Sequence, residues 1–127
     1  QLRQFFGDNQ TIEKEAISDL DKGFVSRFKS LVGERMKDAE LNVEDLGRNM
    51  GMSRVQLYRK LKSLTNYSPN ELLRQMRLKK AASLLASSDM TVAEIAYEVG
   101  FSSPSYFTKC YKEQFGESPT EFLKRRG

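Results

Sequence analysis

An internal duplication constrains this chain of 127 residues more than any other feature. A pattern that begins at Val43 recurs from Val92, an offset of 49 positions, and the offset becomes 50 after one extra residue in a turn. The matched pairs are Val43/Val92, Leu46/Ile95, Gly47/Ala96, Met50/Val99, Gly51/Gly100, Ser53/Ser103, Leu57/Phe107, Arg59/Lys109, Leu61/Tyr111, Lys62/Lys112, Ser68/Ser118, Pro69/Pro119, Glu71/Glu121 and Leu73/Leu123. Because the insertion is confined to a turn, we interpret the chain as two copies of one structural unit, too few for a solenoid.

Each copy has the pattern of a helix-turn-helix. In the first copy, apolar residues at helical spacing from Val43 predict a helix, and Gly51 then ends it, where a backbone with positive φ is needed. Ser53 and Gln56 have the spacing of a capping box that opens a second helix, which we expect to end near Thr65. A small residue four positions before the turn glycine lets two helices cross closely.

The second helix of each copy has two contrasting faces. In the first copy Leu57, Leu61 and Leu64 share one face, which should be buried. The opposite faces carry polar and basic residues suited to base edges and phosphates: Val55, Tyr58, Arg59 and Lys62, then Ser105, Thr108, Lys109 and Lys112. A solvated surface would explain either face alone, but its recurrence in two copies favours a nucleic-acid reader with two reading helices.

We divide the chain into four segments. Residues 1–22 are expected to be a linker from an absent upstream domain, or else a disordered tail, because the chain opens on Gln and this part has a weak pattern. Residues 23–66 form the first unit, 67–88 a long linker helix that begins at a capping box after Ser68, and 89–127 the second unit. The predicted fold is therefore all-α, two helix-turn-helix units joined by a long linker helix, with about seven helices.

Composition narrows the function. The chain has no histidine and one cysteine, Cys110, which removes the usual general base and any cysteine-anchored zinc site, so we expect no enzyme, cofactor or metal. No apolar run approaches the length that spans a bilayer, and no membrane contact is expected of this segment. The net charge of +4 is uneven, with −1 on residues 1–42 (7 Lys/Arg, 8 Asp/Glu) and +5 on residues 43–127 (14 against 9). The basic residues thus accompany the duplicated part, as phosphate binding requires.

Three stretches carry a family resemblance: SRVQLYRKLKSLTNYSPNELL, RLKKAASLL and VAEIAYEVGFSSPSYFTKCYKEQFGESPTEFLKRR. From Phe24 to Arg126 the chain resembles the AraC/XylS family of bacterial transcription regulators, and within it looks most like the C-terminal output domain of hybrid two-component regulators. The resemblance implies two helix-turn-helix units that each place one helix in a DNA major groove. It carries base reading to Val55, Tyr58, Arg59, Ser105, Thr108 and Lys109.

Further expectations follow from this interpretation. Phosphate contacts are expected from Ser53, Arg54, Lys62, Arg74, Arg77, Lys80, Ser103 and Lys112. The partner would be double-stranded DNA in the cytoplasm, with RNA polymerase as a partner of the full regulator, which could be a homodimer and could be anchored in the inner membrane. Two alternatives stay open, a protein-interaction or dimerisation module and a non-specific nucleic-acid or RNA binder. The second is weakened because no aromatic stacking platform is evident.

Overall fold

The computed structural model describes residues 19–126, and within this range it consists of α-helices and connecting turns without strands. The helices are α2 (Asp19–Arg35), α3 (Val43–Asn49), α4 (Arg54–Thr65), α5 (Pro69–Ser87), α6 (Val92–Glu98), α7 (Pro104–Phe115) and α8 (Pro119–Arg126). The prediction of an all-α chain with two helix-turn-helix units and a long linker helix is confirmed. Most of the predicted linker at residues 1–22 lies outside the described residues, but α2 already begins at Asp19, four positions before the predicted first unit.

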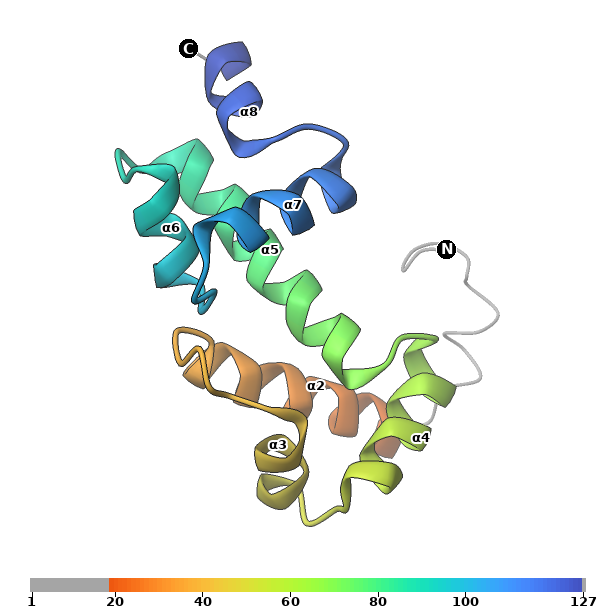
Figure 1. The fold of residues 1–127 in the computed structure, drawn as a ribbon. Helices are drawn as coiled ribbons and strands as arrows, with labels where there is room; N and C mark the ends of the chain where they lie inside the picture. The colour runs from red at the N-terminus through yellow and green to blue at the C-terminus, as the bar shows by residue number, and fades with distance from the viewer. Residues whose placement is uncertain (1–18, 127) are drawn as a thin grey trace.

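The two units have separate hydrophobic cores, and α5 contributes to both. Leu72 and Leu73, near its start, pack with residues of α2, α3 and α4, while Leu78, Ala81 and Leu85 pack with residues of α6 and α7. In Figure 1, α2 and α4 lie beside the first part of α5, with α3 on the far side of α2, and α6, α7 and α8 lie around its second part. The long helix is thus a structural member of both units.

Side-chain hydrogen bonds cap the starts of the helices, including the two starts predicted after Ser53 and Ser68. Ser53, Ser68 and Thr91 each accept a hydrogen bond from the backbone N–H three residues on, and the Gln or Glu at that third position accepts one in return. Ser118 and Glu121 make the same reciprocal pair at the start of α8, with distances of 2.7 and 3.1 Å. Because these bonds join residues only three positions apart, the sequence pattern can predict where such helices start.

The one-residue difference between the two turns has a structural consequence. In both turns an N–H bonds back to the carbonyl five residues earlier, Met52 to Gly47 at 2.8 Å and Phe101 to Ala96 at 2.9 Å. In the shorter first turn, a Cβ on Gly47 would stand 2.7 Å from the carbonyl oxygen of Met52, closer than atoms can approach. The longer second turn accommodates the Cβ of Ala96, which is fully buried.

Two arginines at the end of α8 are bound within the protein. Arg126 donates to the carbonyl oxygens of Leu85 and Ala86 at 2.9 and 2.7 Å, which satisfies acceptors in the last turn of α5. Arg125 pairs with Glu117 at 2.7 Å. Within residues 19–126, no helix is long and apolar enough to cross a membrane, and no cluster of potential metal ligands is present.

Candidate nucleic-acid interface

The second helix of each unit, α4 in the first and α7 in the second, has 12 residues and separates a buried face from an exposed one. Leu64, expected on the buried face of α4, is only half-buried. On α4, Leu57 and Leu61 are completely buried, whereas Val55 and Tyr58 are 57% and 48% exposed, and Arg59 is exposed beside them. An exposed isopropyl group, a phenol and a guanidinium on one face are a combination that can contact thymine methyls, base edges and phosphates.

The equivalent face of α7 is more polar. Phe107 and Tyr111 are buried, and on the opposite side Ser105 and Lys109 are exposed. Thr108, predicted to read bases, is half-buried, so less of its surface is open to a partner. The structure therefore groups the three residues on one side of α7, with Thr108 at the margin.

The serines that open α4 and α7 already act as caps. The hydroxyl oxygen of Ser53 accepts from the N–H of Gln56 at 3.1 Å, and that of Ser103 accepts from the N–H of Tyr106 at 3.2 Å. A capping hydroxyl keeps its own proton as a donor, so a contact to phosphate remains chemically possible. Arg54, the first residue of α4, is exposed next to this cap.

Lys62 and Lys112 occupy equivalent places beside the glutamate that caps the following helix. The Nζ atom of Lys62 is 4.0 Å from a carboxylate oxygen of Glu71. The backbone N–H of Ser68 lowers the pKa of Glu71 most, and Lys62 and Arg74 lower it further. In the second unit the backbone N–H of Ser118 likewise lowers the pKa of Glu121, with a smaller contribution from Lys112. Each lysine would thus share its charge between a carboxylate and any phosphate.

Tyr106 is an exposed aromatic residue that the sequence analysis did not assign to the interface. Its side chain is 51% exposed at the start of α7. A hydrogen bond with Cys110 raises the pKa of Tyr106, and a smaller interaction with Arg74 opposes that shift. A signal for Tyr106 is present in the duplication, where it matches Gln56. Because tyrosine cannot close a capping box, its side chain makes other contacts, and its ring packs against that of Phe101 at a centroid distance of 6.0 Å.

Arg77 does not join the other expected phosphate contacts. Its guanidinium is partly buried between α5 and the turn of the second unit, and it donates to the carbonyl oxygen of Asp38 at 2.8 Å. Burial lowers the pKa of Arg77, and the charge of Asp38 opposes that shift. This position does not favour the expected phosphate role, because the guanidinium is half-buried and already donates to the carbonyl oxygen of Asp38. Lys80, by contrast, is exposed on α5.

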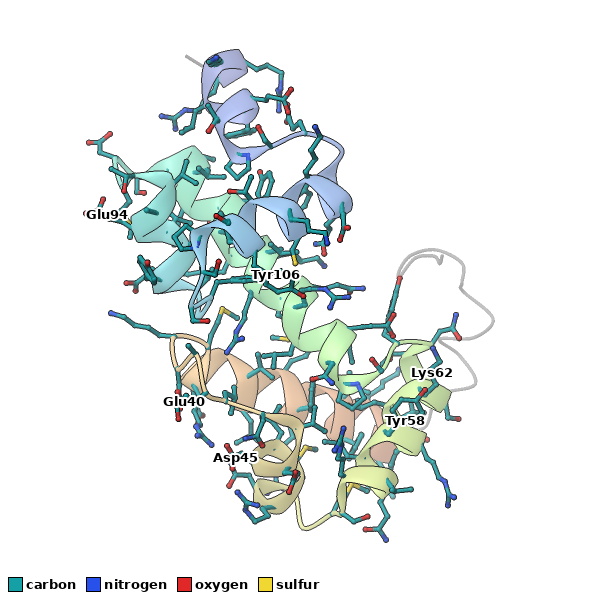
Figure 2. The ribbon with its side chains drawn as sticks, viewed as in Figure 1. Glu40, Asp45, Tyr58, Lys62, Glu94 and Tyr106 are labelled. Atoms are coloured by element: carbon teal, nitrogen blue, oxygen red, sulfur yellow. The ribbon has the colours of Figure 1, made fainter. Side chains whose placement is uncertain are left out.

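The exposed residues extend over both units. Figure 2 shows Tyr58 and Lys62 along α4 and Tyr106 near the start of α7, with α5 running between the two helices. Arg74, on α5, is exposed and interacts with Glu71 of its own helix and with Tyr106 of α7. Cations from three helices therefore contribute to one candidate interface.

This arrangement defines a class of protein, in which one chain holds two helix-turn-helix units on a shared long helix. The model of a helix-turn-helix domain family matches residues 46–125, which is more than half of the chain. The chain belongs to the AraC-type helix-turn-helix family.

Similar proteins include regulators and parts of larger signalling proteins. The chain is 36% identical over 109 residues to the histidine kinase P4 of Formosa agariphila, covering 86% of this chain and 8% of that protein. Among solved structures, it resembles the C-terminal domain of AraT, a response regulator from Geobacillus stearothermophilus, with a TM-score of 0.77, 28% identity, and 87% and 88% of the two chains covered. It also resembles the DNA-binding domain of the global transcriptional factor AdpA in complex with a target DNA, with a TM-score of 0.74, 30% identity, and 79% and 88% covered. The chain spans less than half the length of the curated relatives it matches.

Proposed function

We propose that this chain is a sequence-specific, double-stranded-DNA-binding domain of a bacterial transcription regulator, which reads DNA with α4 and α7 together. The observation that carries the proposal is the matched pair of helices, each buried on one face and exposing polar and basic residues on the other. A helix of this diameter fits the major groove, where each base pair presents a distinct pattern of donors and acceptors. The family to which the chain belongs, and the AdpA domain bound to its target DNA, support the same function.

The exposed residues divide into two roles. Base reading is assigned to Val55, Tyr58, Arg59, Ser105, Thr108 and Lys109, which lie on the outward sides of the two helices. Phosphate binding is assigned to residues at the starts of α4 and α7, in the last turns of these helices and along α5: Ser53, Arg54, Lys62, Arg74, Lys80, Ser103 and Lys112. Phosphate contacts orient the protein without reading sequence, and base contacts supply the specificity.

The domain's wider setting is part of the proposal. The similarity to a histidine kinase over 8% of its length, and to the C-terminal domain of a response regulator, supports the output domain of a two-component signalling protein. On this proposal the domain binds DNA in the cytoplasm and has no catalytic activity of its own. The full regulator would contact RNA polymerase, could form a homodimer, and could be anchored in the inner membrane.

Selection of bound sites from a random duplex library tests this function. We expect one recurrent sequence, bound more tightly than random duplex, with an affinity that falls steeply as salt rises because phosphate-bound counterions are released. Equal affinity for selected and random duplexes would identify a non-specific binder. No measurable affinity for either duplex would favour a protein-interaction module.

A further inference from the structure

Apart from the helix α5 that they share, the two units also meet at the corner that follows α2. The carbonyl oxygen of Asp38 in this corner accepts from Arg77 of α5, and the Nζ atom of Lys37 is 3.2 Å from a carboxylate oxygen of Glu98 at the end of α6. The turn of the second unit, at Gly100, also packs here against the carbonyl oxygen of Met36. A segment of the first unit therefore touches the turn that positions α7.

Gly100 makes room for this contact. A Cβ on Gly100 would overlap the carbonyl oxygen of Met36 and would stand 2.8 and 2.9 Å from Nε and Cζ of Arg77. The guanidinium of Arg77 thus lies directly against the turn, where no side chain intervenes. Gly51, the matched glycine of the first unit, has a similar positive φ of 70° but nothing within 4 Å of an added Cβ. Of the two matched turns, only the second makes this contact.

The position of Arg77 is costly for a surface arginine. Its Nε is buried without a hydrogen-bond partner, the one such side-chain atom in the described part of the chain. An unpaired buried donor destabilises the folded state, so an arginine at this position is favoured only if its other contacts offset that loss. The planar guanidinium does, however, reach a carbonyl of the first unit and the turn of the second at once, which a flexible ammonium does less well.

We propose that Arg77 and Gly100 form an inter-unit clamp that fixes α7 relative to α4, and that this clamp sets the spacing between the two DNA segments that the chain reads. Arg77 is thereby a positioning residue, which touches no base or phosphate. The effect on the spacing of the DNA segments rests on the proposed DNA-binding function, whereas the clamp itself is a property of the free protein.

The DNA-free test measures the distance between the two reading helices. Nitroxide labels at Ser63→Cys on α4 and Glu113→Cys on α7, both exposed positions, are introduced with Cys110→Ala, and their distance distribution is recorded by pulsed electron resonance. We expect one narrow distribution for the parent, a broader or shifted one for Arg77→Met, and an intermediate one for Arg77→Lys. Lys79→Met, which removes the same charge from the same helix, should match the parent. An unchanged distribution in Arg77→Met, or an equal change in Lys79→Met, overturns the clamp.

The DNA test uses the selected site with its two segments moved apart or together by one or two base pairs. The parent should prefer the selected spacing, whereas Arg77→Met should bind that spacing about tenfold more weakly and discriminate less among spacings, because a loose joint lowers the effective concentration of the second unit. The salt slope should be unchanged. A slope lowered by about one with an unaltered spacing preference would identify Arg77 as a phosphate contact and overturn the clamp.

If the parent prefers no duplex, the proposed function fails while the distance measurement still decides the clamp. If Arg77→Met does not fold, Arg77→Lys is compared in its place, and parent-like distances and spacing preference in it overturn the clamp.

Discussion

At the scale of single residues, Arg59 and Lys62 separate base reading from positioning on one helix. Arg59 is exposed beside Tyr58, where a bidentate contact to guanine would contribute about 1–3 kcal/mol of discrimination. Arg59→Ala should therefore weaken binding to the selected site more than to random duplex. Lys62→Ala should weaken both alike and reduce the salt slope by about one. The measurement is affinity for both duplexes over a salt series, and an unchanged specificity ratio in Arg59→Ala would remove Arg59 from the base-reading set.

Gly47 and Ala96 provide a second test at this scale, because they occupy matched positions in turns of different length. Gly47→Ala places a Cβ 2.7 Å from a backbone oxygen, so the helix pair must shift, and we expect a loss of about 1–3 kcal/mol in the free energy of unfolding. The matched change Ala96→Gly removes a buried methyl and adds backbone freedom, and should cost about 0.5–1 kcal/mol. Urea denaturation measures both. A neutral Gly47→Ala would mean that the first turn is looser than its geometry shows.

At the scale of helices and turns, features that depend on residues close in the chain could be predicted from the sequence. The caps at Ser53, Ser68 and Thr91 depend on partners three residues away, and the positive φ of Gly51 and Gly100 follows from a helix end. Contacts between distant segments were not predictable in this way. On α5 the sequence does not distinguish Arg77 from Arg74, because their roles depend on whether the corner after α2 lies against the helix. The roles of the individual DNA-binding residues stay predictions.

The capping boxes of α5 and α8 should make stability depend on pH at the acidic end. Glu71 and Glu121 have pKa values lowered in the folded state, first by the N–H groups of Ser68 and Ser118. A carboxyl with a lowered folded pKa stabilises the fold above its unfolded pKa of about 4.3, and that stabilisation is lost as pH falls through the folded pKa. Glu71→Gln keeps the capping hydrogen bond without the charge, so its melting temperature should fall less between pH 7 and pH 3 than that of the parent. The control is Glu113→Gln, on the exposed side of α7, and equal losses in all three proteins would contradict the assignment.

At the scale of the whole molecule, the length of α5 relates the two units to the DNA repeat. Its 19 residues span about 28 Å at ~1.5 Å per residue. Major grooves on one face of DNA recur every ~34 Å, so the two reading helices fit successive grooves if the DNA bends slightly toward the protein. Since the units are direct repeats in one chain, the site for one molecule should be asymmetric rather than palindromic.

A spacer series tests whether both units read DNA at once. One molecule should protect two segments about 10 base pairs apart, and inserting five base pairs between them turns the second segment to the opposite face of the duplex. The second unit cannot follow, because α5 is continuous and packs into both cores, so affinity should fall toward that of one unit alone. Inserting ten base pairs returns the second segment to the original face of the duplex but moves it beyond the reach of two units joined by α5. The protein should therefore bind this duplex no more tightly than the duplex with the five-pair insertion.

The matching change in the protein is Gly-Gly inserted between Ala81 and Ala82, which interrupts α5 where it packs against the second core. Because glycine loosens a helix interior, the units should be partly uncoupled, with weaker binding at the selected spacing and a smaller penalty for the five-pair insertion. A Gly-Gly insertion after Gly127, beyond the described residues, is the control for added length and should leave the whole series unchanged. Binding is measured at fixed salt across all spacings. If the parent is indifferent to the five-pair insertion, a single unit reads DNA and the other copy serves packing or another partner.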